Sequence, residues 1–240
     1  AQMVDLSKVS EPELAKITKG AQAVAEVMGV DVVDVTKAAG NMMKNGLAPD
    51  AQTALDIIAT GAQNGANNAG DLLDTLGEYS DSFANIGLDG KDALGMMTAA
   101  MQGGAFSTDI AADSVREFGT RVLDGSAEAG GAFKTLGLDG AKMAKDIAGG
   151  GPAAKTAMET IMTALSNTTD PLAKETAGVA LFGGMWEDAG AKMVLSMNPA
   201  SDTIGDVTGA AQKMGDTLQN NTGTKVEQNY LITGLAMHYC

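Results

Sequence analysis

The sequence predicts an all-α protein in which multiple short helices, joined by glycine-capped helix–turn–helix corners, form a compact or folded-back bundle. Three observations support this class: apolar residues recur at steps of three and four, glycines punctuate the periodic segments, and aromatic residues make up only 4% of the 240 residues. Apolar residues at those steps lie on one face of a helix. Aromatic and β-branched residues favour strands, and the sequence shows no sustained alternation of apolar and polar residues.

Four apolar series mark helices along the chain. In order they are Leu14, Ile17, Ala21, Val24 and Met28; Ala51, Leu55, Ile58 and Ala62; Ile110, Ser114, Phe118 and Val122; and Ala154, Met158, Ile161 and Leu165. Ser10, followed by Glu13, forms a capping box at the start of the first helix, where Pro12 is tolerated in the first turn. Gly151-Pro152 and Asp170-Pro171 are expected to open two later helices in the same way.

One tripeptide pattern, glycine–aliphatic–aspartate, occurs three times. The copies are Gly29-Val30-Asp31, Gly87-Leu88-Asp89 and Gly137-Leu138-Asp139. Glycine ends a helix in the left-handed conformation, the aliphatic residue folds back onto the last turn, and aspartate caps the next helix. The copies are about fifty to sixty residues apart, which indicates a degenerate repeat and not a regular solenoid. Internal duplication and independent reuse of an efficient corner both remain open.

Further glycine pairs separate the periodic segments, so the helices cannot join into one long rod. They fall at Gly103-Gly104, Gly130-Gly131, Gly149-Gly150-Gly151 and Gly183-Gly184. No proline-rich or charged linker marks a domain boundary, and the weakest point lies around residues 103–107. We therefore expect an N-terminal helical region at residues 1–103, a C-terminal helical region at 104–228, and an irregular or non-native tail at 229–240.

The composition argues against several classes of function. The net charge is −14, and 16 basic residues against 30 acidic ones are too few for nucleic-acid recognition and disfavour anionic membrane surfaces. The single cysteine, Cys240, allows no internal disulfide. The first residues lack the features of a signal peptide, and because Ala1 is no initiating methionine we expect a processed piece or an excised fragment.

The candidate catalytic and metal-ligating residues are few. Asp71, Asp74 and Glu78 lie on one predicted helical face, as a paired-acid glycosidase site or a calcium or magnesium site would require. A solvated polar face explains them equally well. His238 lies beside Cys240, but two ligands are too few for a structural zinc site. We expect no enzyme activity, no catalytic residue, no cofactor and no metal.

Trp186 is the only tryptophan and is followed by Glu187 and Asp188. An indole beside two acids is one way to build a platform for a sugar. The alternative, which we favour, is that Trp186 anchors a small core with Leu181 and Phe182, because large aromatics bury more area than alanine or methionine.

Six segments, in this order, carry a family likeness: Asp56–Gly65; Asp71–Asp74 leading to Glu78, Tyr79, Ser80 and Phe83; Gly87-Leu88; Met101–Ala105; Asp113 to Glu117-Phe118; and Leu181–Gly184 followed by Trp186, Glu187 and Asp188. Together they resemble the shared core region of the tape measure proteins of tailed bacteriophages, from about residue 4 to residue 227. Whole tape measure proteins are much longer than this chain, so the resemblance implies a segment. Residues 229–240 do not resemble the family.

The resemblance implies a structural protein of the virion, present in the lumen of the phage tail and in the host cytoplasm during assembly. Tape measure proteins template tail length, and leave the tube ahead of the DNA during genome delivery. The implied partners are tail tube and tail-tip proteins, tail assembly chaperones and further copies of the chain.

Two alternatives stay open: a membrane-active helical bundle with transient membrane contact, and a small cell-wall glycan hydrolase that uses Asp71 and Asp74. We also expect the helices between Gly104 and Gly149 to cover the apolar face of Leu14–Met28 or a neighbouring chain.

Overall fold

The computed structural model describes residues 10–201 and 203–220, which form fourteen helices and no strand. The predicted all-α class is therefore confirmed. The helices are short, and they are α1 (Glu11–Met28), α2 (Val32–Lys44), α3 (Ala51–Gln63), α4 (Leu72–Glu78), α5 (Ser80–Asn85), α6 (Gly90–Gly103), α7 (Thr108–Leu123), α8 (Ala127–Thr135), α9 (Gly140–Gly149), α10 (Gly151–Asn167), α11 (Pro171–Phe182), α12 (Gly184–Asp188), α13 (Ala191–Ser196) and α14 (Ala210–Asn220).

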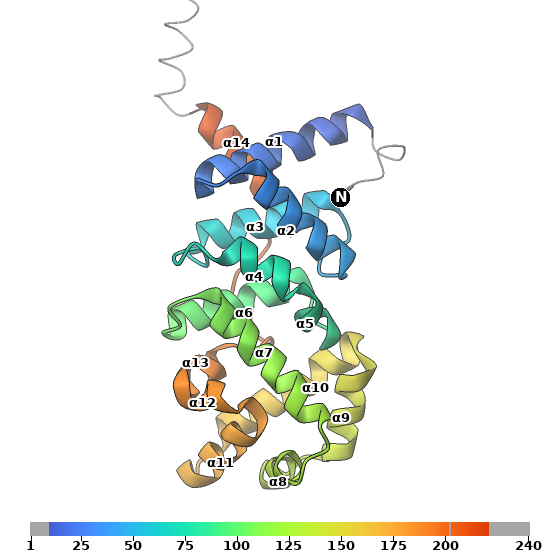
Figure 1. The fold of residues 1–240 in the computed structure, drawn as a ribbon, viewed down its shortest axis with the longest axis vertical. Helices are drawn as coiled ribbons and strands as arrows, with labels where there is room; N and C mark the ends of the chain where they lie inside the picture. Colours follow the sequence, from blue (N-terminus) through green and yellow to red (C-terminus); the bar gives the residue numbers. More distant parts are fainter. Residues whose placement is uncertain (1–9, 202, 221–240) are drawn as a thin grey trace, which may run out of the picture.

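The helices stack along the long axis of the molecule, with α1 and α14 at one end and α8 and α11 at the other (Figure 1). The stack follows the chain: α2 packs on α1, α3 and α4; α6 packs on α3 and α7; and α7 packs on α9 and α11. After α13 the chain returns to the first end, where α14 packs on α1 and α3. The predicted folded-back arrangement is therefore confirmed.

The expectation about Leu14–Met28 is wrong in one respect. The buried residues of α1, which include Ala21 and Val24, face α14, α3 and α2. The helices between Gly104 and Gly149 pack instead on the middle and the far end of the stack. Sequence proximity does not explain this arrangement, because α14 lies at the other end of the described chain.

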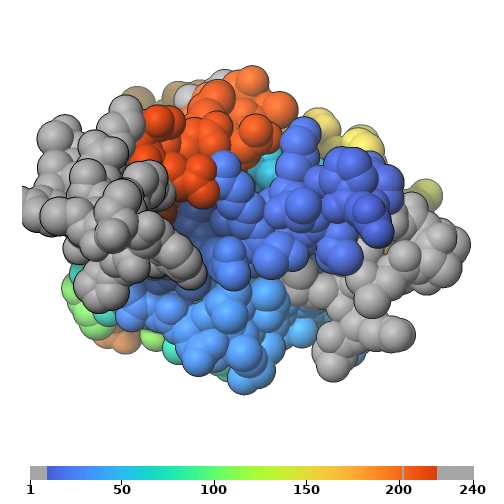
Figure 2. All heavy atoms as spheres, turned by 90° about the horizontal axis from the view of Figure 1, so that it is seen from above, coloured from blue at the N-terminus to red at the C-terminus, as the bar shows by residue number. Residues whose placement is uncertain are grey.

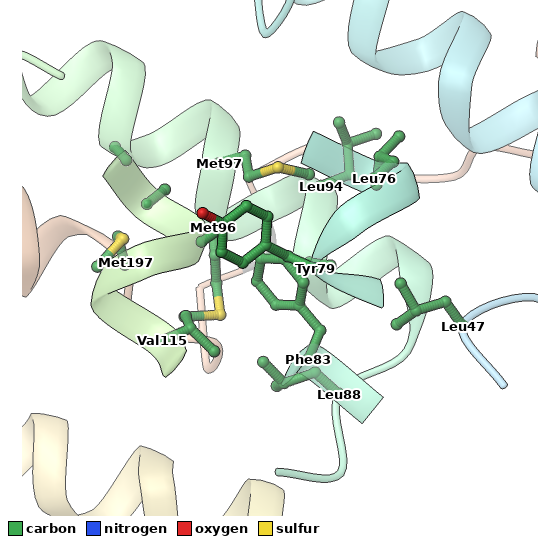
Figure 3. Packing of buried hydrophobic residues seen from close by; sticks show 14 of the residues in the cluster. Leu47, Leu76, Tyr79, Phe83, Leu88, Leu94, Met96, Met97, Val115 and Met197 are labelled. Carbon is green, nitrogen blue, oxygen red and sulfur yellow. The ribbon is translucent and has the colours of Figure 1, made fainter. Parts of the chain in front are cut away.

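One hydrophobic cluster runs through the described residues and includes side chains on both sides of residue 103. At its centre, the rings of Tyr79 and Phe83 lie among methionine and aliphatic side chains (Figure 3). Methionine has a flexible, unbranched side chain, so it fills the irregular gaps between short helices. The division into regions 1–103 and 104–228 stays a prediction, and the tail at 229–240 lies outside the described residues.

The predicted helix starts are present. The Ser10 hydroxyl accepts from the Glu13 backbone amide at 3.4 Å while the Glu13 carboxylate accepts from the Ser10 amide at 3.0 Å. Asp170 caps α11 by accepting from the amides of Leu172 and Ala173, and α10 begins at Gly151. None of the helices in the described part of the chain is both long and apolar enough to cross a bilayer.

Candidate functional site

The three glycine–aliphatic–aspartate corners share one backbone geometry. Gly29, Gly87 and Gly137 have φ values of 68°, 74° and 69°, in the left-handed region that favours glycine. In each corner the glycine amide and the following amide donate to the last turn of the helix, which is the Schellman pattern. The three pairs of bonds are Gly29 N to Glu26 O and Val30 N to Ala25 O, Gly87 N to Ala84 O and Leu88 N to Phe83 O, and Gly137 N to Lys134 O and Leu138 N to Phe133 O.

The aspartate of each corner sits at the N-cap of the next helix. Asp31 accepts from the amide of Val33 at 2.8 Å, Asp89 from that of Asp92 at 2.8 Å, and Asp139 from that of Lys142 at 3.0 Å. A carboxylate at this position satisfies a free amide and interacts favourably with the helix dipole. Each corner thus ends one helix and starts the next within three or four residues.

Two further corners have the same backbone bonds without the tripeptide, and one of them falls at Gly103-Gly104, where a break between helices was expected. Gly46 and Gly104 have φ values of 86° and 117°, and the residues that follow them donate to Met42 O and Ala100 O. Their next helices start later, at N-caps Asp50 and Ser107. Because aspartate does not follow at the second position, a search for the tripeptide misses them.

The corner at Gly87 is also a contact between layers of the stack. A Cβ placed on Gly87 would lie 1.8 Å from the carbonyl oxygen of Gly151, at the start of α10. The amide of Gly90 donates to Leu47 O at 2.8 Å, which ties this corner to the one between α2 and α3. Nothing lies within 4 Å of a Cβ placed on Gly29 or Gly137, so only the middle corner is closely packed.

Asp71 caps a helix that is remote in the sequence. Its Oδ2 accepts from the backbone amides of Thr108 and Asp109, at 2.6 and 3.2 Å, at the start of α7. The N-cap residue of α7, Ser107, makes no side-chain capping bond of its own. A buried hydrogen bond of 2.9 Å between the hydroxyls of Thr75 and Thr108 lies beside it. This arrangement, which we call the Asp71 joint, fixes α4 against α7.

Asp56 does the same for α14. The side chain is 4% exposed, and its two oxygens accept from the amides of Gly209 and Ala211 at 2.8 and 2.9 Å. Gln52 donates to it from the previous turn of α3, at 3.0 Å. A buried carboxylate needs such donors, because burial without them is strongly unfavourable. This is the Asp56 joint. In the sequence, Asp56 stood out only as the first residue of Asp56–Gly65, one of the segments that resemble the family.

A third joint links α4 and α5 to α7 through Tyr79. The phenol donates to Asp113 at 2.8 Å, and Arg116 pairs with Asp113 at 2.6 Å while its guanidinium lies 5.1 Å from the centre of the Tyr79 ring. Burial, together with the bond to Asp113, raises the pKa of Tyr79 to about 12. Nearby, Asn45, at the C-terminal end of α2, donates to the hydroxyl of Ser80 at 2.6 Å.

Trp186 lies in an aromatic cluster at the far end of the stack. The ring centroids of Phe118 and Phe182 are 5.1 Å apart, and those of Phe182 and Trp186 are 6.2 Å apart. All three side chains are buried. The Trp186 indole donates to Glu175 at 2.9 Å, and it packs so closely on Gly178 that an added Cβ would lie 2.1 Å from the ring. This contact geometry leaves no open face of the indole for a sugar.

One surface hollow is lined by charged residues, two of which form an ion pair between helices. A hollow of about 340 Å³ between α6, α10 and residues 199–204 contains Asp89, Asp92, Lys155 and Glu159. Burial lowers the pKa of Lys155, but its 2.7 Å bond to Asp92 and the charge of that group outweigh burial, so the pKa is raised. The pair therefore links α6 to α10.

The predicted acidic cluster is divided by the fold. Asp71 is committed to the α7 amides, while Asp74 and Glu78 are exposed. Within the described ranges, no group of three or more His, Cys, Asp or Glu residues is placed to hold a metal ion. His238 and Cys240 lie outside these ranges.

The comparisons with known proteins agree with the likeness seen in the sequence. A family model described as phage-related minor tail protein matches residues 1–183. The probable tape measure protein of Streptomyces phage phiC31 is 44% identical over 209 residues, which are 86% of this chain and 28% of that protein. The chain thus spans less than a third of the curated relative that it matches. No solved structure matches it. The family match covers most of the chain, and the chain belongs to the phage-related minor tail protein family.

Proposed function

We propose that this chain is a structural segment of a tail tape measure protein, which acts in tail assembly, length determination and genome delivery and not as an enzyme. The observation that carries the proposal is the 44% identity, over 209 residues, to a protein named as a probable tape measure protein. The joints support a structural role, because Asp71, one of the candidate catalytic acids, holds two helices together.

Within the parent protein, this segment serves for attachment and assembly and not for measurement. A single α-helix of 240 residues would be about 360 Å long at 1.5 Å per residue. The described residues instead form short helices that fold back on themselves. A folded stack adds little length per residue, so the measuring helices lie elsewhere in the parent.

The proposed partners are tail tube and tail-tip proteins, tail assembly chaperones and further copies of the chain, in the tail lumen and in the host cytoplasm during assembly. Several large apolar side chains are available for contacts with other proteins: Val27, Val33, Phe106, Leu123 and Leu172 are each between 47% and 80% exposed.

The test is an in-frame deletion of residues 104–149 in the parent phage, with an equally long deletion in a helical region outside this segment as the control. The first deletion removes α7, α8 and α9, on which α4, α5, α6, α10 and α11 pack. We expect it to abolish infectious particles. The control should give working tails shorter by about 70 Å, at 1.5 Å per residue.

Electron micrographs of the tails separate the outcomes. If the deletion of 104–149 gives infectious particles with tails about 70 Å shorter, this segment measures length. If the control deletion leaves tail length unchanged, the tape measure role of the parent is wrong.

A further inference from the structure

Two helical hairpins of the stack follow one pattern. In the first, α2 lies between left-handed glycine corners at Gly29 and Gly46, and in the second, α6 lies between those at Gly87 and Gly104. The two glycines are equally far apart in the sequence of each hairpin, and all four corners have the same backbone bonds. The helix that follows, α3 or α7, packs on the first helix of its hairpin. The two hairpins are therefore equivalent, position by position, from the first corner to the second.

Within the chain the two hairpins meet corner to corner. The corner at the start of α6 lies against the corner at the end of α2, where the Gly90 amide donates to the Leu47 carbonyl oxygen at 2.8 Å. A Cβ on Gly90 would lie 2.7 Å from that oxygen and 3.2 Å from the terminal methyl carbon of Met42. Leu47, Ala48 and Leu88 are each no more than 3% exposed. This contact shows how the start corner of one hairpin can cover the end corner of another.

The equivalent side chains at the other two corners are exposed. At the start of α2, Val30 and Val32 occupy positions that are buried in the second hairpin, but they are 36% and 38% exposed, and Val27 and Val33 beside them are 47% and 50% exposed. We call these four residues the valine corner; it belongs to the end of the stack where α1 and α2 lie at the surface (Figure 2). At the end of α6, Phe106 occupies a position that is buried in the first hairpin, but it is 80% exposed.

The exposed corners match one another in the size of their side chains. Within the chain, Gly90 contacts Leu47, and the equivalent residues at the exposed corners are Val32 and Ala105. A larger side chain on one corner is thus matched by a smaller one on the other, so the total volume at the contact changes little. Phe106, next to Ala105, adds an aromatic ring of the kind that is enriched in protein interfaces.

We infer that the valine corner of one copy of this chain docks on the Phe106 corner of a second copy, so that the contact between the two hairpins is repeated between molecules. The contact joins two different surfaces, and each copy carries both. The inference gives the place of one proposed partner, a further copy of the chain, and rests on that part of the proposed function. Association in solution tests the contact, whereas tail length tests the tape measure role, so the two can fail separately.

Sedimentation velocity of the 240-residue chain tests the association. Two corners present few side chains, so we expect a Kd on the order of 0.1 mM. Val33→Lys and Phe106→Lys should each weaken association at least about tenfold, because each would bury a charge in an apolar contact. Exposed acids, Asp31 and Asp109, flank the two corners, so added salt should strengthen the association of the unmodified chain.

Leu172→Lys is the matched control. Leu172 is an apolar side chain that is 75% exposed and lies outside both corners, so its replacement should leave association unchanged. Val33 and Phe106 are likewise half or more exposed, so all three variants should keep the helical content and the midpoint of unfolding of the unmodified chain.

A mixture of the two weakened variants gives a sharper result. Val33→Lys keeps an intact Phe106 corner and Phe106→Lys keeps an intact valine corner, so one contact can form between unlike chains. An equimolar mixture should therefore associate with a Kd within about fivefold of that of the unmodified chain, although neither variant does so alone.

A disulfide provides a second measurement that does not depend on a weakened variant. Val33→Cys in one chain and Phe106→Cys in another, each with Cys240→Ser, should form a disulfide between unlike chains on mixing and oxidation. Each variant should cross-link with itself much more slowly, because the contact does not bring like corners together.

Two results would overturn the inference. One is a chain that stays monomeric at concentrations up to about 1 mM, which would mean that the exposed corners have no affinity for each other. The other is an association that neither lysine substitution weakens, which would place the contact between copies elsewhere on the surface.

Discussion

At the scale of single residues, Trp186 has the largest side chain of the buried core, and its surroundings fix it on every side. It contacts Phe182, packs on Gly178 and donates to Glu175. Trp186→Ala should lower the free energy of unfolding by roughly 3 kcal/mol or more, because it leaves a cavity that closely packed neighbours cannot fill. Chemical denaturation of the two proteins measures the difference.

Trp186→Phe separates the ring from its hydrogen bond. Glu175 is exposed, so the loss of the indole donor leaves that carboxylate solvated, and most of the stability should remain. An alanine variant with an unchanged midpoint of unfolding would contradict the buried position of the indole.

Tyr79 gives a prediction about pH. Its pKa of about 12 in the fold lies above the ordinary value near 10, so the folded state holds the phenol proton more tightly than the unfolded state does. The contribution of Tyr79 to stability is therefore fully present below pH 10 and is lost as pH rises from 10 to 12. The difference in stability between the wild type and Tyr79→Phe should shrink over that range, as followed by denaturation at each pH.

The comparison with Tyr79→Phe is the control, because lysine side chains titrate in the same range and affect both proteins equally. A difference that stays constant from pH 9 to 12 would show that the phenol is not held in its neutral form.

Sequence reasoning reached Trp186 but misread Asp71 and gave no role to Asp56. A large aromatic side chain is most stable in the core, so the burial of Trp186 could be predicted from the residue and its neighbours in the sequence. Asp71 and Asp56 accept from amides 37 and 153 residues away, respectively, at their nearest. In the sequence, a carboxylate that caps a remote helix looks the same as one that faces solvent.

At the scale of elements, the corners allow a matched pair of substitutions. Gly87→Ala and Gly137→Ala both place a side chain at positive φ, which is unfavourable by about 1–2 kcal/mol. Only at Gly87 does the new Cβ also collide with the backbone, at Gly151 O. Gly87→Ala should therefore destabilise the protein by roughly 1–3 kcal/mol more than Gly137→Ala does, in thermal or chemical unfolding.

Equal effects of the two substitutions would mean that the corner at Gly87 is not packed against the start of α10.

The corners themselves could be predicted because their bonds are local, within about six residues. The contact of Gly87 with Gly151 could not, since it depends on the way in which α9 and α10 fold back beside α5. The corners at Gly46 and Gly104 also have local bonds, but they lack the tripeptide, because the N-caps Asp50 and Ser107 follow the glycine only after additional residues.

At the scale of the whole molecule, the sequence predicted short helices that fold back but not the order of the layers. Helix faces rich in alanine and methionine are similar in shape, so they do not specify which neighbour they meet. The arrangement is decided by a few polar groups, such as Asp56 and Asp71, and by closely packed glycines such as Gly178 and Gly87.

The return of the chain to α1 has a mechanical consequence. The start of α1 and the end of α14 both lie at one end of the long axis (Figure 1), so a pull on the two ends acts directly on the contact between these two helices. Fully drawn out, the described residues would span on the order of 700 Å at about 3.4 Å each, whereas in the fold both ends lie at the same end of the stack. The folded stack is therefore a large store of extensible chain length between its two ends.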